Sequence, residues 1–338
     1  MFKHRQFYIK FQSFYHLLSC GRFNTLRGFY PDELGKSTTL KFHDNGRIRD
    51  YCPNDGSEKN ECKTDLDKIK ALFLWLFKQN IISRICSLST DQPKVFIIYI
   101  IIWLKFKLNQ ISHHNITEIK DYYNNYIENS KDYTNCNEHD NDCCSTLKDQ
   151  LGHDTFKDFI KENEYFMDMD MGMDNISNFY YAFKSLCNMH TECNSQNPDL
   201  VNFSKYVKEF GEKYEKLNND SNNTDGSSHR QILSILSNDY DSFKTKYKDA
   251  QCCKSSSLPT IGNKKIIVKG SGETLVHNSE ETHAQNSEAI PQSPSIGNKL
   301  FIVLSIFAAI PIFLGIAYKV NNIIFKNDFN YIYVNINK

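Results

Sequence analysis

The sequence has no net charge, because its 40 Lys and Arg residues balance its 40 Asp and Glu residues. Strong attraction to nucleic acid or to an anionic membrane surface needs an excess of basic residues, so the balance predicts no nucleic-acid partner. The sequence also lacks a glycine-rich phosphate loop and a nucleophile elbow. His113 and His114 stand without a Cys or Ser motif beside them. We therefore expect a protein that is not an enzyme and binds no cofactor.

Long hydrophobic runs are scarce, and one run alone has the length of a membrane span. It begins at Leu300, ends at Tyr318 and contains no charged residue. A helix needs about 17–25 apolar residues to cross the hydrocarbon core, where only a helix satisfies its own backbone. Pro311 removes one donor near the middle and favours a kink. The run predicts a single helix in a lipid bilayer. The alternative is a buried C-terminal helix of a soluble protein.

A second apolar run, VFIIYIIIWL at residues 95–104, is too short to span a bilayer. Lys105 and Lys107 end it. A helix that is apolar on every side is usually buried in a protein interior. The run therefore predicts the central core helix, with a second membrane segment as the alternative.

No alternating apolar pattern predicts a strand, so the expected fold class is all-α. Thr64 and Asp67 have the spacing of a capping box, as do Thr155 and Asp158. Further helices are expected to start at Pro93 with Asp91 or Thr90 as the cap, at Thr117, before Ile176, near Ser204 and before Ile232. These helices are expected to share one core.

Composition divides the chain into five parts. Residues 1–28 form an atypical leader, in which Lys10 and Gln12 interrupt the apolar stretch that a signal peptide needs. Residues 29–254 form the helical, cysteine-containing ectodomain. Residues 255–299 are rich in Ser, Gly, Pro, Glu and Asn and predict a flexible, low-complexity stalk. The transmembrane helix at 300–318 and a short cytoplasmic tail at 319–338 follow.

Eleven cysteines is a high count for a cytosolic protein, and all of them precede the apolar run at 300–318. This one-sided placement predicts disulfides in an oxidising compartment, and the odd count leaves at least one thiol over unless it pairs between chains. Adjacent cysteines rarely bond to each other, so we expect Cys143–Cys144 and Cys252–Cys253 to bridge to distant partners. The disulfide candidates, with pairing open, are Cys52, Cys62, Cys136, Cys143, Cys144, Cys187, Cys193, Cys252 and Cys253.

Two segments contain residue patterns that suggest a metal-binding site, and the first of them uses cysteines. Cys187, His190 and Cys193 have ligand-like spacing, and His139, Cys143 or Cys144 would complete a zinc site. Cysteines ahead of a membrane anchor more often form disulfides, so we expect no metal there.

The acidic segment with Asp168, Asp170 and Asp174 is similar to a calcium loop, but Gly172 and Phe179 occupy positions where an EF-hand needs oxygen ligands. We reject that site and expect the acidic turn to precede a helix, whose N-terminus favours negative charge.

Several blocks carry a resemblance to a known family. They are FYPDEL at 29–34, KFHDNGRIRDYCPN at 41–54, NECKTDLDKI at 60–69, LWLFKQN at 74–80, FYYAFKSLCNMHTEC at 179–193, QILSILSNDYDSFKTKY at 231–247 and IPIFLGIAYK at 310–319. In this order they resemble the Plasmodium interspersed repeat (PIR) variant antigens, the yir/bir/cir group of rodent malaria parasites. The resemblance covers about residues 29–319.

The resemblance implies a multigene family of malaria parasite proteins with a helical ectodomain and one C-terminal anchor. It implies a place at the infected erythrocyte surface or in exported or parasite membranes. The implied roles are antigenic variation, immune evasion and host interaction, with a host receptor or an antibody as partner. It implies no enzymatic activity and no cofactor, and no binding residue carries over. The rival class is a structural or trafficking protein of parasite-derived membranes.

Three departures from the family pattern stand out. Family members usually have a short leader with a Cys soon before the PDEL block, whereas 28 residues precede that block here. Lys70, Ala71, Leu72 and Phe73 replace a Gly-Gly-Cys before the LWLF block, and the tail lacks the family's strongly basic character. These departures raise two alternatives, a misassigned first exon and a non-functional, truncated gene copy.

Overall fold

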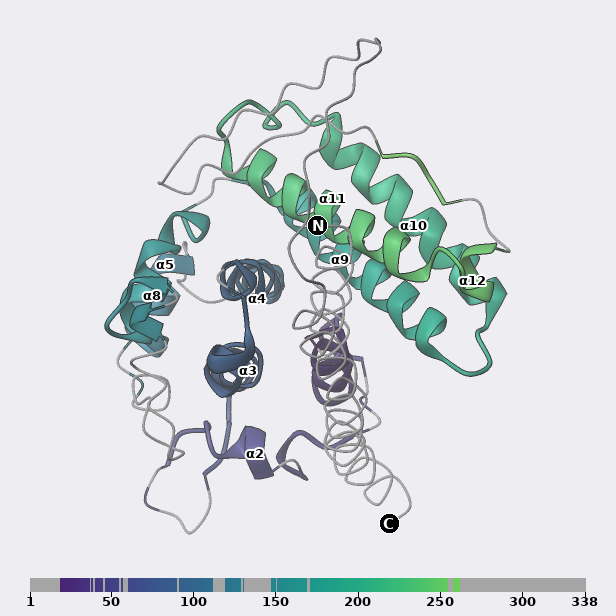
Figure 1. Cartoon of the computed structure of the whole chain (residues 1–338). Helices are drawn as coiled ribbons and strands as arrows, with labels where there is room; N and C mark the ends of the chain where they lie inside the picture. The colour runs from purple at the N-terminus through teal and green to yellow at the C-terminus, as the bar shows by residue number, and fades with distance from the viewer. Residues whose placement is uncertain are drawn as a thin grey trace, which may run out of the picture. The chain divides into compact units, whose positions relative to one another are not determined.

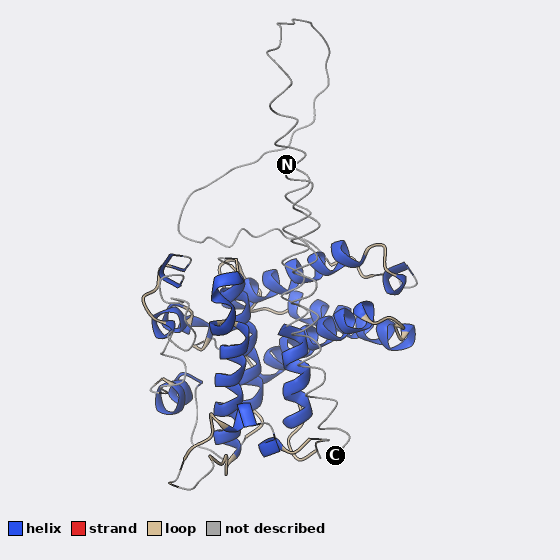
Figure 2. Cartoon of the chain, turned by 60° about the horizontal axis from the view of Figure 1, so that its bottom comes forward, coloured by secondary structure: helices blue, strands red, loops and turns tan. Residues whose placement is uncertain are grey.

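The computed structural model describes residues 19–36, 38, 40–44, 46–54, 56, 60–89, 91–111, 119–128, 130, 147–149, 151–168, 171–254 and 258–261. The chain separates into two compact units, Met1–Gly270 and Ser271–Lys338, and every described residue belongs to the first. The described residues form helices and connecting loops and contain no strand (Figure 2). The all-α prediction is confirmed for this part of the chain.

Residues 19–29 form the first described helical segment. The elements that follow are η1 (Phe42–Asp44), α2 (Gly46–Arg49), α3 (Asp65–Asn80), η2 (Ile82–Ser87), α4 (Gln92–Leu108), α5 (Ile119–Tyr122), η3 (Tyr123–Ile127), α8 (Phe156–Glu162), η4 (Glu164–Phe166), α9 (Met173–Asn194), α10 (Leu200–Asn218), α11 (Ser228–Tyr247) and α12 (Gln251–Lys254).

Helices α3 and α4 pack against each other and form the interior (Figure 1). The predicted capping box of α3 is confirmed, because Thr64 accepts from the Asp67 N–H and Asp67 accepts from the Thr64 N–H. Helix α4 has Pro93 in its first turn and is buried on nearly every side. Its largest side chain, Trp103, is completely buried. The prediction that residues 95–104 form the central core helix is confirmed.

Helix α9 packs on α4 and joins this interior to α10 and α11 (Figure 1). Tyr99 of α4 stacks on Phe183 of α9 with ring centroids 4.0 Å apart, and Phe106 stacks on Tyr180 at 4.1 Å. Such aromatic pairs contribute roughly 0.5–1.5 kcal/mol beyond the area they bury. The buried face of α9 therefore holds the two parts of the described fold together.

Helix α10 begins earlier than the sequence pattern predicted. The start expected near Ser204 is wrong, because Asp199 is the N-cap and accepts from the N–H groups of Val201 and Asn202. An Asp side chain satisfies two donors that would otherwise lack partners, so it defines the helix start. The cap predicted at Thr155 is confirmed, since its hydroxyl accepts from the Asp158 N–H at the start of α8.

The first described helical segment crosses the predicted boundary at residue 28. Cys20, Phe23 and Leu26 are buried in the core, and Phe23 contacts Phe183 edge-on at 5.0 Å. Residues 19–28 are therefore part of the packed domain. The sequence pattern missed this because residues 1–28 were judged as a leader from the interrupted stretch around Lys10 and Gln12, which precedes Cys20.

No helix among the described residues combines the length and apolar content that crossing a bilayer requires. The predicted stalk from residue 262 onward, the predicted anchor at 300–318 and the predicted tail lie outside the described residues. The predicted helix start at Thr117 lies outside them as well.

Candidate functional site

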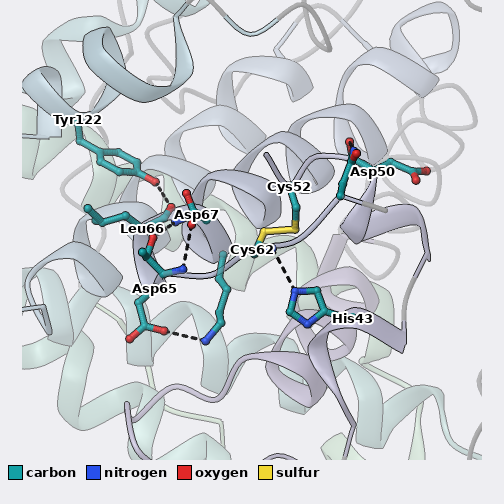
Figure 3. Close-up of a disulfide and its surroundings, with 11 residues drawn as sticks. His43, Asp50, Cys52, Cys62, Asp65, Leu66, Asp67 and Tyr122 are labelled. Carbon is teal, nitrogen blue, oxygen red and sulfur yellow. Dashed lines mark hydrogen bonds and ion pairs between the residues drawn. A yellow bond between two sulfur atoms is a disulfide. The ribbon is translucent and has the colours of Figure 1, made fainter. Parts of the chain in front are cut away.

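The first disulfide joins Cys52 to Cys62 across a short loop ahead of α3 (Figure 3). The Cα atoms are 4.9 Å apart, and the backbone N–H of Cys62 donates to Nε2 of His43 at 3.1 Å. Asn60 extends the closure by donating to the Asp50 carbonyl at 2.9 Å. The bridge therefore fixes the loop directly before the first turn of α3.

The start of α3 is held from a second direction by Tyr122, whose hydroxyl donates to the Leu66 carbonyl at 2.7 Å (Figure 3). Asp65 pairs with Lys68 at 3.1 Å on the outer side of the same turn. Burial, the largest cause, raises the pKa of Tyr122, so this side chain remains a neutral donor. These bonds hold the first turn of α3 in place.

The second disulfide joins Cys20 to Cys187, which are 167 residues apart in sequence. Both residues are buried, Cys20 in the first helical segment and Cys187 within α9. A disulfide that closes so long a loop lowers the entropy of the unfolded chain. In the chain-entropy model this stabilises the folded state by several kcal/mol. Cys20 was outside the predicted set of disulfide candidates. The family pattern of a Cys shortly before the PDEL block was the signal that could have found it.

The third disulfide joins Cys193, near the end of α9, to Cys252 of α12. The neighbouring Cys253, also among the predicted disulfide candidates, carries a free thiol in this structure. Its sulfur lies 3.8 Å from that of Cys252. Two neighbouring cysteines cannot both bond to the one cysteine that α9 offers here. The predicted candidates Cys136, Cys143 and Cys144 lie outside the described residues.

The described residues that were considered for a zinc site make other contacts in the structure. Cys187 bonds to Cys20, Cys193 bonds to Cys252, and His190 packs edge-on against Phe243 at 4.9 Å. The sulfurs of Cys193, Cys252 and Cys253 do lie within 4.8 Å of one another. Two of these sulfurs are joined in a bridge and lack the thiolate charge that zinc requires of cysteine.

The acidic segment before α9 forms separate contacts. Asp168 accepts from Lys120 at 3.1 Å, and Asp174 lies in the first turn of α9. The acidic turn was expected to precede this helix; Asp174 instead lies within its first turn, where the helix dipole also favours negative charge. Asp170 lies outside the described residues.

A buried polar cluster surrounds Asp32, which belongs to the FYPDEL block. Its carboxylate accepts from the Tyr180 hydroxyl and forms an ion pair with Lys184, both on α9. Burial opposes ionisation of Asp32, but Arg27 and Lys184 outweigh it, so the pKa of Asp32 lies below its ordinary value. The charged carboxylate thus attaches the loop that follows the first helical segment to α9.

Lys107 of α4 reaches the same loop from the other side. It is completely buried, and its ammonium donates to the carbonyl oxygens of Pro31 and Asp32, the latter at 2.8 Å. The ammonium also lies 4.9 Å from the ring centroid of Tyr30. Burial lowers the pKa of Lys107 to about 8, against an opposing effect of Asp32. The sequence pattern placed Lys107 at the end of an apolar run and missed its buried role.

Another buried pair joins α4 to α11, where the Tyr99 hydroxyl donates to a carboxylate oxygen of Asp239 at 2.5 Å. Burial, with a further contribution from Asp239, raises the pKa of Tyr99 well above its ordinary value. Tyr99 therefore remains a neutral donor at physiological pH. Like the cluster around Asp32, this pair joins segments that are far apart in the sequence.

Comparison with known proteins finds a matching family and a solved structure of similar fold. The family model described as Plasmodium variant antigen protein Cir/Yir/Bir matches residues 20–319. A solved structure described as a Plasmodium PIR protein ectodomain is 29% identical, with a TM-score of 0.50. The match covers 74% of this chain and 99% of the solved chain. A search of curated proteins finds no match. The family match begins at Cys20, the residue whose disulfide attaches the first helical segment to α9.

Proposed function

Because this chain belongs to the Plasmodium variant antigen Cir/Yir/Bir family, we propose that it is a non-enzymatic variant antigen of the infected red cell or of parasite membranes. Its proposed roles are antigenic variation, immune evasion and host interaction. The proposed partner is a host receptor or an antibody, recognised through exposed helices and loops of the ectodomain.

The observation that supports this role is the contrast between a cross-linked interior and a polar outer surface. Among the described residues, one disulfide joins the first helical segment to α9, another joins α9 to α12, and a third closes the loop before α3. Outside this interior, α10 buries five residues and exposes most of the others. Exposed positions usually tolerate substitution within about 0.5 kcal/mol. A fold of this kind allows its surface to change while its interior is retained.

The proposed location follows from the apolar run at residues 300–318. As a single membrane-spanning helix it would attach the disulfide-containing domain to a bilayer. All cysteines precede that run, and disulfides persist in oxidising surroundings, so the domain is proposed to face away from the cytosol. The rival proposal is a structural or trafficking protein that stays in internal parasite-derived membranes.

Surface labelling of intact infected red cells tests the proposal. A membrane-impermeant biotin reagent is applied before lysis, and the chain is recovered with antibodies raised against its helical domain. We expect biotin on the full chain and none on a matched variant that lacks residues 300–318. Labelling only after permeabilisation would favour the internal-membrane role. Absence of the chain from infected cells with an intact transcript would indicate a non-functional gene copy.

A further inference from the structure

The end of the described helical domain brings three sulfur atoms together. Cys193 lies near the end of α9, and Cys252 and Cys253 are neighbours in α12. Their sulfurs all lie within 4.8 Å of one another, although one bridge uses only two of them. We propose that Cys193 has two alternative disulfide partners, Cys252 and Cys253, and that thiol–disulfide exchange between them converts this end of the domain between two forms.

The exchange conserves all atoms and electrons within the chain. Cys253 gives its proton to solvent, and its thiolate attacks the Cys193 sulfur. The Cys193–Cys252 bond breaks, and its electron pair leaves on the Cys252 sulfur, which takes a proton from solvent. One disulfide and one thiol are present before and after, so no oxidant or reductant is needed. Attack on Cys252 would instead join adjacent residues, whose disulfide geometry is strained.

Helix α12 has the local structure that this exchange needs. It is a single turn of four residues, and the N–H groups of Cys253 and Lys254 both donate to the Ala250 carbonyl. Successive residues of a helix point about 100° apart, so presenting Cys253 to Cys193 requires this short turn to rotate. A turn held by few backbone hydrogen bonds opens more readily than the long helices beside it. The site therefore contains an attacking thiol on Cys253, a disulfide between Cys193 and Cys252, and a short helix, α12, that can rotate.

The two partners differ in their surroundings, so exchange changes the structure. Cys252 is buried and Cys253 is half-buried. Rotation of α12 would also pull on the segment that follows, where the Pro259 carbonyl accepts from Tyr240 of α11 at 2.9 Å. The Pro259 ring also lies beside Gly211 of α10. Exchange would therefore move α12 relative to α9 and α11, the helices that it contacts.

Burial raises the pKa of the Cys253 thiol to about 11. The thiolate is the attacking species, and only about one thiol in ten thousand is ionised at pH 7 at that pKa. Exchange is accordingly slow at neutral pH and increases about tenfold with each pH unit up to the pKa. The high pKa preserves the Cys193–Cys252 form for long periods without preventing the other form.

The test uses the full chain, produced in an oxidising compartment and kept at pH 5. One portion is incubated at pH 9 without added thiol, and all portions are acidified, alkylated and mapped by mass spectrometry. We expect alkylated Cys252 and a Cys193–Cys253 bridge after incubation at pH 9, above the level in the Cys253→Ser variant. Alkylation confined to Cys253 under both conditions, or equal alkylation of Cys252 in the variant, would overturn the proposal.

A second variant, Cys252→Ser, checks the alternative bridge directly. We expect Cys193 to bond to Cys253 in this chain, which leaves no alkylatable thiol at either position. A free Cys193 thiol in a chain that still melts cooperatively would contradict the proposal. If the variant does not fold, the incubation of the unmodified chain decides the question, because it requires no substitution.

Discussion

Helices α4 and α10 are similar in length and differ in almost everything else. Helix α4 is buried on nearly every side, whereas α10 buries one row of residues against its neighbours. The start of α4 has no side-chain cap, whereas Asp199 caps α10. The difference indicates that burial stabilises α4 and leaves it little freedom to vary. Helix α10 depends on one face and a cap, so its outer face remains free to change.

The largest expected effect comes from truncating the centre of α4. Trp103→Ala removes a completely buried indole, and such a substitution typically costs about 3–5 kcal/mol. We expect a loss of this size in the free energy of unfolding, measured by urea denaturation followed by circular dichroism. The control is Lys208→Ala on the exposed face of α10. A cost below about 1 kcal/mol for Trp103→Ala would show that α4 is not the tightly packed centre.

The next effect concerns the charge that α4 carries in the interior. Burial lowers the pKa of Lys107 to about 8 from its ordinary value of 10.5. Between those values the unfolded chain holds more protons than the folded chain, so stability rises with pH through this window, by up to about 3 kcal/mol. Urea midpoints measured at pH 7.5 and pH 9.0 on chain with Cys253 alkylated would show the start of the rise. The upper value stays below the ordinary pKa of tyrosine, because burial raises the pKa of Tyr99 and Tyr122 and ionisation of these residues in the unfolded chain would lower stability at higher pH.

Two variants separate the contribution of Lys107 from other lysines. Lys107→Met is expected to remove part of the rise, and Lys208→Met on α10 is expected to leave it unchanged. Some rise remains in both, because burial also lowers the pKa of Lys246 to about 8. An identical pH profile for Lys107→Met and the unmodified chain would indicate that the Lys107 ammonium is well solvated.

Removing a helix cap is expected to cost less stability than truncating a buried side chain. Here the larger loss is expected for α10 and the smaller for α4. Asp199→Ala removes the acceptor for two N–H groups of α10 and is expected to cost about 1 kcal/mol. Asp91→Ala at the start of α4 is expected to cost only a few tenths of a kcal/mol, because Asp91 forms no side-chain cap bond. Equal losses in thermal denaturation would remove the distinction between the two helices.

The smallest effect on stability is expected on the outer face of α10. Val201 is 81% exposed, so Val201→Ser should change the free energy of unfolding by less than about 0.5 kcal/mol. Under the proposed function, antibodies raised against the folded domain should include some that lose binding to this variant. A panel that binds both chains equally would show that this part of α10 is not an antigenic surface.

Local chemistry made several features predictable from the sequence. The caps at Thr64 and Thr155 depend on residues three positions apart, and the buried character of α4 depends on one uninterrupted apolar run. The start of α10 was misplaced because the hydrophobic spacing was followed and the capping capacity of Asp199 was overlooked. The capping residue that would have corrected this error lies only a few residues before the predicted start.

Periodicity and capping act within one or two helical turns, so the all-α class, the position of the core helix and most helix starts were predictable from the residues alone. The three-dimensional structure was needed to show which cysteines pair, since Cys20 meets Cys187 across 167 positions and Cys193 meets Cys252 across 59. It also decided that Asp32 joins its loop to α9 while Cys253 remains a thiol. Such partners depend on how helices pack, and helix packing brings together residues whose separation in sequence carries no local signal.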